Sequence, residues 1–241
     1  MLRVKRVFSF SETGKRSLQQ DAVWPPINGR PNDNCLFVVC DGLGGQANGE
    51  IASNIAVRAI HRYATNNSTD LQGMIDHAVN ELKNYADLHP EAATMATTLA
   101  MACINNDTVS LAWCGDSRII HIRDGKILYQ TEDHTLAAEL IAQGNLSEEG
   151  VRYFPEHRVL QRSLSPSGNR SISSTHTITG VCDNDWLVLC SDGFLELLSP
   201  QEIADLLVFK PDAEQLAIHL YAIGLAYTND NCSGHIIQLT R

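Results

Sequence analysis

Aspartates that follow apolar runs are the residues of this 241-residue chain whose placement most suggests chemistry. Asp41 follows the run at 36–40, Asp116 the run at 109–114 and Asp192 the run at 186–190, while Asp230 stands ahead of the last apolar segment. If the runs are neighbouring buried strands, their end carboxylates converge at one rim. Like charges gathered there raise one another's pKa unless a cation neutralises them. Mg²⁺ and Mn²⁺ prefer such oxygen ligands, so the spacing indicates a divalent metal site.

A plain turn is the alternative interpretation of each Asp-Gly pair. Asp124-Gly125 lies between two strand runs without further glycines, so it predicts an ordinary hairpin turn. The pair at 192–193, taken alone, reads the same way. Asp41 differs because four of its next eight residues are glycine, at 42, 44, 45 and 49. Glycine lets the backbone turn sharply and approach an ion or a phosphate, so the Gly42 carbonyl is a candidate ligand.

The elements that must position these residues can be predicted from periodicity. Short apolar runs bounded by turn residues predict buried strands, and helical spacing of apolar residues predicts amphipathic helices. Ser199 and Glu202 form a capping box ahead of one helix. Long helices separated by antiparallel strands favour an α+β fold with helices packed on sheets. The strands are expected at 4–10, 36–40, 109–114, 118–123, 126–130, 186–190 and 234–239, and the helices at 50–63, 70–88, 136–143, 200–207 and 213–226.

Composition narrows the functional classes. A hydrophobic fraction of 44% is that of a globular protein, and the net charge of −10 argues against nucleic-acid binding. No apolar window is long enough for a membrane-spanning helix, so no membrane insertion is expected. Seven cysteines without Cys-x-x-Cys spacing predict buried thiols in a cytoplasmic protein rather than a zinc site. The polar stretch at 147–170 predicts a lid or recognition loop.

Seven motifs occur in an order and spacing that resemble the PP2C-like family of metal-dependent protein serine/threonine phosphatases. The resemblance extends from about residue 8 to residue 239 and is greatest to compact bacterial members. It implies a β-sandwich of two antiparallel sheets flanked by helix pairs, with the metal centre at one edge. It also implies one domain over 1–241, with a helical arm and flap at about 135–170. The motifs are Arg16-x-x-Gln19-Gln20-Asp21, residues 38–45, Ala96-Thr97-Thr98, Gly115-Asp116-Ser117-Arg118, Thr131-Glu132-Asp133-His134, Ser191-Asp192-Gly193 and Asp230-Asn231.

The resemblance implies a role for each site residue. Two Mn²⁺ or Mg²⁺ ions are expected in the core, with a third, weaker site. Water bridging the core metals would attack the phosphorus of phosphoserine or phosphothreonine directly, without a phosphoenzyme. In this scheme Asp41 bridges the two metals, Gly42 supplies a carbonyl, Asp192 and Asp230 hold the first metal, Asp116 and Asp192 hold the third, Arg16 binds the substrate phosphate, and Asp21 orients metal-bound water.

Some positions depart from the family pattern or leave a choice open. Gln20 stands where many relatives have Glu, and Leu43 where eukaryotic relatives have a general-acid His. Glu148, Glu149 and Glu156 are equal candidates for a flap ligand of the third metal. His134 and Arg118 are expected to be structural, the latter paired with carboxylates. His157 and Arg158, in the flap region ahead of Val159-Leu160, are candidates for contact with a phosphopeptide.

The expected partners are phosphorylated proteins and a bacterial Ser/Thr kinase whose action the enzyme opposes, and a monomer is expected. Two alternative functions stay open. One is a weakly active or inactive PP2C-like module that binds or regulates. The other is a phosphatase of a small phosphate ester. Retention of all four candidate metal aspartates favours the active protein phosphatase.

Overall fold

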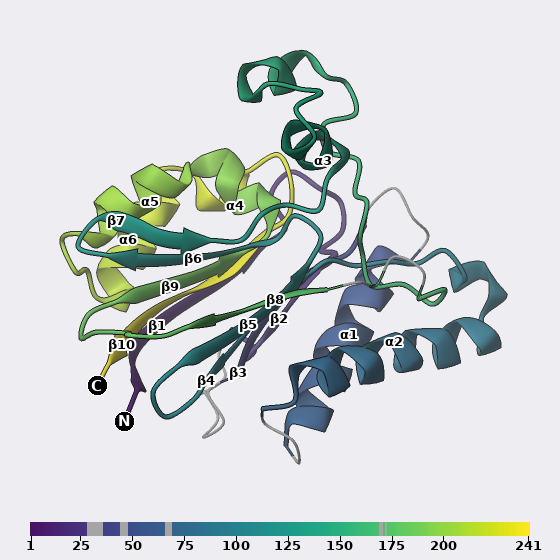
Figure 1. The fold of residues 1–241 in the computed structure, drawn as a ribbon, viewed down its shortest axis with the longest axis horizontal. Helices are drawn as coiled ribbons and strands as arrows, with labels where there is room; N and C mark the ends of the chain where they lie inside the picture. The colour runs from purple at the N-terminus through teal and green to yellow at the C-terminus, as the bar shows by residue number, and fades with distance from the viewer. Residues whose placement is uncertain (28–35, 44–47, 66–68, 169–170, 172) are drawn as a thin grey trace.

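Two antiparallel β-sheets packed face to face form the centre of the computed structural model, which describes residues 1–27, 36–43, 48–65, 69–168, 171 and 173–241 (Figure 1). Each described sheet has five strands. The first has the order β1 (Arg3–Glu12), β10 (Cys232–Thr240), β9 (Trp186–Cys190), β6 (Arg118–Arg123), β7 (Lys126–Gln130). The second has the order β2 (Asp21–Trp24), β3 (Leu36–Asp41), β4 (Leu99–Ile104), β5 (Val109–Cys114), β8 (Ser174–Ile178).

Helices cover the outer faces of both sheets and give an α/β/β/α arrangement (Figure 1). The long helices α1 (Gly49–Ala64) and α2 (Leu71–Leu88) pack on the second sheet. Helices α4 (Asp192–Leu197), α5 (Pro200–Leu207) and α6 (Ala213–Ala222) pack on the first. Helix α3 (Leu136–Ala142) stands apart on a projecting arm, followed by the 3₁₀ turn Glu148–Tyr153. The predicted α+β sandwich is confirmed.

The apolar runs are continuous because their strands are buried on both faces. In β3, Phe37 and Val39 face the opposite sheet, while Leu36, Val38 and Cys40 pack under the α1–α2 pair. Strand β9 alternates in the same way between the sheet interface and the α4–α6 layer. Side chains of successive strand residues point to opposite faces, so each strand contributes to two cores at once.

A buried charge cluster joins β6 to the loop before β9. The Asp185 side chain has no exposed surface and accepts hydrogen bonds from His121 Nε2 at 2.9 Å and from Arg123 Nε at 2.6 Å. The Cys182 amide donates to the same carboxylate at 2.9 Å. Burial opposes ionisation of Asp185, but the bonds from Arg123 and His121 outweigh it and lower its pKa. The cluster fastens the end of the first sheet that lies away from the arm.

Three sequence expectations need correction. The helix predicted over 213–226 ends at Ala222, because Gly224 adopts φ 111°, which favours glycine and ends a helix. The Asp192-Gly193 pair, read alone as a turn, begins helix α4. Strands β2, β4 and β8 were not predicted. The hairpin at Asp124-Gly125 is confirmed, since both residues have positive φ.

The cysteine expectation holds only in part. Cys40, Cys103, Cys190 and Cys232 are buried, whereas Cys182 is exposed. Burial raises the pKa of the Cys103 thiol to about 12. Cys35, and the predicted turn glycines at 44 and 45, lie outside the described residues.

Candidate metal centre

The paired ends of β2 and β3 place the first two carboxylates. Asp21 and Asp41 are direct partners in the antiparallel register. Thr98 fixes the end of β3, because its Oγ1 accepts a hydrogen bond from the Asp41 amide at 2.9 Å. The Thr97 hydroxyl donates to the Asp41 carbonyl, also at 2.9 Å. The Ala96-Thr97-Thr98 motif therefore holds the backbone from which the Asp41 side chain projects.

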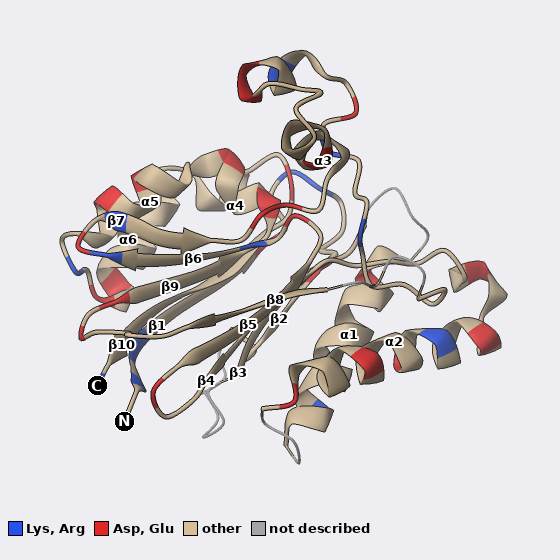
Figure 2. Ribbon diagram, viewed as in Figure 1, with Lys and Arg blue, Asp and Glu red and all other residues tan. Residues whose placement is uncertain are grey.

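The other sheet supplies two more carboxylates at the same end of the sandwich. Asp192 is the first residue of α4, directly after β9, and Asp230 lies two residues before β10. Ser191 links the sheets, because its hydroxyl donates to Asp21 Oδ2 at 2.8 Å and accepts from the Ser233 amide at 3.0 Å. Figure 2 shows acidic ribbon segments at the start of α4 and along the loop from β7 to α3.

The residues predicted as metal ligands line one cavity of about 820 Å³. Asp21 is not part of its wall: the side chain is 5% exposed and sits behind Asp41. Its Oδ1 atom is buried without a hydrogen-bond partner among the described residues, so it has unused capacity to accept a hydrogen bond. The wall includes Asp41, Gly42, Asp116, Asp192 and Asp230, together with Arg16, Gln20 and Leu43.

Asp41, Asp116 and Asp192 hold their protons more tightly than ordinary aspartates, because the pKa of each is raised. Burial, reinforced by Asp192 and Asp133, raises the pKa of Asp116 to about 7. Burial and then the charge of Asp21 raise the pKa of Asp41 well above its usual range. Burial, and then Asp230, also raise the pKa of Asp192. A site with excess negative charge and oxygen donors fits a hard divalent cation, which would favour the ionised carboxylates.

Two arginines neutralise part of this charge. Arg16 Nη2 lies 2.6 Å from Asp230 Oδ2, and Arg158 Nη1 lies 3.7 Å from Asp192 Oδ2. As the side chains lie, no three acidic, histidine or cysteine residues within the described ranges converge as a ready-made metal cage. Asp230 is therefore paired with Arg16 rather than facing the cavity as an unpaired carboxylate. The Arg16 guanidinium has a fork of donors that matches the oxygens of a phosphate.

Gly42 occupies a position where a side chain does not fit. A Cβ there would lie 2.2 Å from the Gly49 carbonyl oxygen at the start of α1 and 2.7 Å from the Gln20 carbonyl oxygen. The Gly42 amide donates to that Gln20 oxygen at 3.0 Å. The close approach brings the Gly42 backbone to the cavity wall between β2 and α1.

Asn231 has a structural role that sequence reasoning did not assign. Its Nδ2 donates to the carbonyls of Thr13 and Leu18 at 2.9 and 3.0 Å, and its Oδ1 accepts from the Gln20 amide at 2.8 Å. These bonds clamp the segment that carries Arg16 and Gln20 beside Asp230. The Asp230-Asn231 pair marked the position, but an amide's bonds to distant backbone cannot be read from spacing.

Residues from the flap stretch also reach the cavity. Leu164 forms a two-bond bridge to Thr97, with N–O distances of 3.0 and 2.8 Å, which places Ser163 and Ser165 on the wall. Arg158, a candidate for contact with a phosphopeptide, lines this cavity. Of the three candidate flap ligands, Glu148 lines a neighbouring cavity, and Glu149 and Glu156 line neither.

Two interpretations of neighbouring residues are confirmed. Arg118 makes a bidentate ion pair with Asp133, with N–O distances of 2.7 and 2.6 Å. His134 anchors the start of the arm, since its Nδ1 accepts from the Gly115 amide and its Nε2 contacts Ser174 Oγ at 3.0 Å. Burial lowers the pKa of His134 to about 4, so the ring is neutral there.

Comparison with known families gives the geometry a context. A family model described as protein phosphatase 2C matches residues 11–220. The chain belongs to the protein phosphatase 2C family. One similar relative in this family is the serine/threonine phosphatase stp of Listeria innocua. It is 30% identical over 184 residues, a match that spans 73% of this chain and 72% of that protein.

Solved structures agree with this family membership. The serine/threonine phosphatase Stp1 of Staphylococcus aureus superposes with a TM-score of 0.84 and 25% identity, over 98% of this chain and 95% of that one. The catalytic domain of the phosphatase PstP, in a complex with two manganese ions, superposes with a TM-score of 0.81 over the whole of both chains. At 23% identity that second likeness establishes the shared fold.

Proposed function

We propose that this chain is a protein-serine/threonine phosphatase that depends on Mn²⁺ or Mg²⁺. The observation that carries the proposal is the convergence of Asp41, Asp116, Asp192 and Asp230, from both sheets, on one cavity that Arg16 also lines. The names of the relatives, which are serine/threonine phosphatases, support the same reaction and substrate class.

Different residues of the chain would bind the metal ions and the substrate phosphate. Asp41 would hold both core ions and the Gly42 carbonyl one of them, with Asp192 and Asp230 holding the first. Asp116 and Asp192 would hold a third, weaker ion. Once released from Asp230, Arg16 would orient the phosphoryl group and stabilise the charge that develops on its oxygens. Asp21, behind the wall, would accept a proton from water and fix its orientation.

Bound metal ions supply a water of lowered pKa as the nucleophile and neutralise the phosphoryl charge. The two manganese ions in the PstP complex support a pair of such ions. Leu43 has no proton to donate, so protonation of the leaving seryl or threonyl oxygen has to come from water. No cysteine lines the cavity in the described part of the chain, and burial raises the pKa of the Cys40 thiol beside Asp41 in sequence, so the reaction would not use a thiol.

The cellular setting is also part of the proposal. We place the enzyme in the cytoplasm as a monomeric single domain over 1–241 that opposes a bacterial Ser/Thr kinase. The arm and flap at 135–170 would be its recognition element. No helix in the described ranges combines the length and apolar character needed to cross a bilayer. The acidic net charge does not suit a nucleic-acid partner.

Phosphate release from a phosphothreonine peptide, measured with Mn²⁺, Mg²⁺ or EDTA, tests the proposal. We expect release that requires metal and is abolished in Asp192→Asn, because Asp192 would serve two ions. Circular dichroism would show that this variant stays folded, and free phosphometabolites would be poor substrates. Full activity of Asp192→Asn would disprove the site. No release by the folded wild type would favour a regulatory module.

A further inference from the structure

A second cavity, of about 720 Å³, opens beneath the arm and meets the metal-site cavity. Asp116, Arg158 and Asp192 line both, so the two cavities adjoin at these side chains. A volume of this size is in the range that accommodates a bound ligand of several side chains. The second cavity is therefore within reach of residues that flank a phosphorylated residue held at the metal site.

The wall of the second cavity combines half-buried apolar side chains with acidic ones, of which Glu132 and Glu148 are exposed. Ala138 and Ile141 on α3, Val151 after it and Leu195 on α4 supply the apolar surface. The acidic residues on its wall outnumber the arginines: they are Asp116, Glu132, Asp133, Glu148, Asp192 and Glu196, against Arg118 and Arg158.

Two glutamates carry the negative charge that the arginines of this wall do not neutralise. Asp133 is neutralised by Arg118, and Glu196 by Arg158 at 3.1 Å. Asp116 and Asp192 belong to the metal site. Glu132 and Glu148 remain, and no ion pair involves either side chain in the part of the chain that the structure describes. Both are exposed, one before the arm and one within it.

We propose that this cavity binds the substrate polypeptide next to its phosphorylated residue and selects a Lys or Arg side chain there. The inference rests on the proposed phosphatase function and adds a specificity to it. A long basic side chain lays its methylene groups along apolar surface while its charge stays near the rim, which is the pattern that this cavity presents. Glu132 and Glu148 are the specificity-determining residues, and a flanking acidic side chain is repelled.

A set of phosphothreonine peptides tests the selection. Each peptide carries one Arg or one Glu at a single position near the phosphothreonine, and kcat/KM is measured for each Arg/Glu pair. We expect an Arg preference of about three- to ten-fold at one or more adjacent positions, weakening at high salt. Glu132→Gln and Glu148→Gln should each reduce the ratio, and the double variant should bring it close to one. The matched control is Glu139→Gln, an exposed glutamate of α3 outside the cavity wall, which should keep the full ratio.

The Arg/Glu ratio of kcat/KM distinguishes substrate selection by Glu148 from metal binding by Glu148. Loss of a metal ligand at Glu148 would lower kcat/KM for all peptides alike and leave the Arg/Glu ratio unchanged. An unchanged ratio in the double variant, or a wild type without Arg preference, would overturn the inference while leaving the phosphatase function intact.

Binding of the labelled peptides in EDTA separates the inference from the proposed function. If the wild type released no phosphate but still bound Arg peptides more tightly, and lost that preference in the double variant, the proposed function would fail and the selection would stand.

Discussion

Removal of one cavity carboxylate should make the metal-free protein more stable while impairing its metal site. The pKa of Asp116 is about 7 in the fold, against an ordinary value of 3.8. Because the folded state binds this proton more tightly than the unfolded state, stability falls as the pH rises from about 4 to about 7. A pKa that rises from 3.8 to about 7 on folding lowers the free energy of unfolding above pH 7 by about 4 kcal/mol. The side chain faces a solvent-accessible cavity, which reduces the effect to about 2 kcal/mol.

The variant Asp116→Asn has no such charge and avoids this penalty. In EDTA at pH 8 its midpoint of thermal unfolding should exceed that of the wild type by about 4–8 °C. At pH 4 the two proteins should unfold together, since Asp116 is then protonated. Adding Mn²⁺ should raise the wild-type midpoint more than that of the variant.

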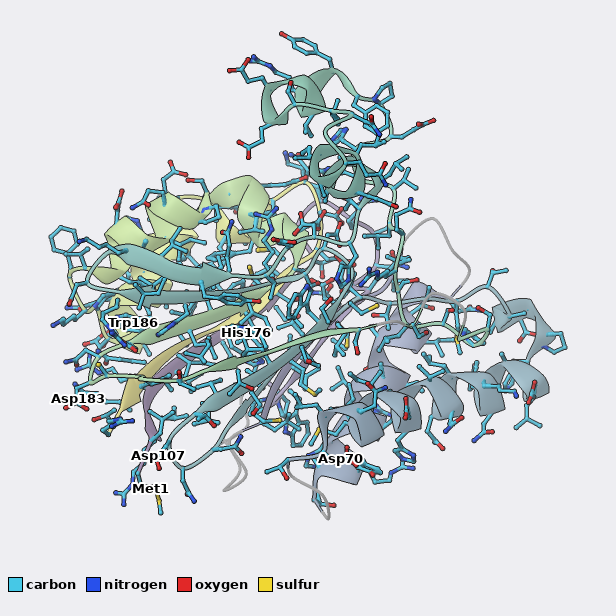
Figure 3. The ribbon with its side chains drawn as sticks, in the orientation of Figure 1. Met1, Asp70, Asp107, His176, Asp183 and Trp186 are labelled. Carbon is cyan, nitrogen blue, oxygen red and sulfur yellow. The ribbon has the colours of Figure 1, made fainter. Side chains whose placement is uncertain are left out.

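Differential scanning calorimetry at both pH values measures these midpoints. Asp107→Asn is the control, because Asp107 is exposed and lies near the chain termini, far from α3 (Figure 3). The reasoning would be refuted if Asp116→Asn were less stable than wild type at pH 8 in EDTA. It would also be refuted if the midpoint of the variant differed from that of wild type by the same amount at both pH values.

Three other substitutions test separate parts of the structure. Arg16→Ala should raise KM for a phosphopeptide about ten-fold with a smaller change in kcat, because the substitution removes one charge-assisted phosphate contact. Steady-state kinetics measure both constants, and an unchanged KM would contradict the prediction. Asp185→Asn should cost about 3 kcal/mol in urea unfolding at pH 7, because His121 and Arg123 lose their buried partner, whereas the exposed Asp183→Asn should cost little. Because the pKa of Asp185 is lowered in the fold, its ionised form stabilises the protein above about pH 4, and this stability is lost as the pH falls further. The free energies of unfolding of Asp185→Asn and Asp183→Asn should therefore become similar in acid. Gly42→Ala should cost about 2 kcal/mol or more and abolish phosphate release, since its Cβ would overlap the Gly49 carbonyl; a fully active, equally stable variant would show that the backbone there can move.

Much of the centre was predictable because its residues sit at the ends of strands. The apolar runs before Asp41, Asp116 and Asp192 are long enough to identify buried strands, and antiparallel layers bring their ends to one edge. The helices over α1, α2 and α5 were equally clear from periodicity. Strand β8 was missed because three of its five residues are exposed, so it lacks the apolar alternation that marks a strand.

Contacts made by side chains over long sequence distances could not be predicted. Nothing local to Asn231 indicates that it binds the backbone of Thr13 and Leu18. The sequence predicted contact of Arg158 with a phosphopeptide but no acidic partner for it within the protein. Its approach to Asp192 and Glu196 depends on how the flap folds back, which the spacing of residues does not determine.

The place of β10 between β1 and β9 has a consequence for the order in which the molecule matures. The first strand of the chain finds its partner only in the last, with Arg3 opposite Thr240 and Glu12 opposite Cys232. Pairing between segments so far apart in sequence is slow, because a long loop must close before any contact rewards it. During synthesis β1 cannot pair until residues 232–240 have left the ribosome. The bonds of Arg16 to Asp230 and of Gln20 to Asn231 cannot form earlier either. A chain that lacks residues 232–240 therefore cannot pair β1 with β10, and we expect no phosphatase activity from a nascent copy before these residues have been made.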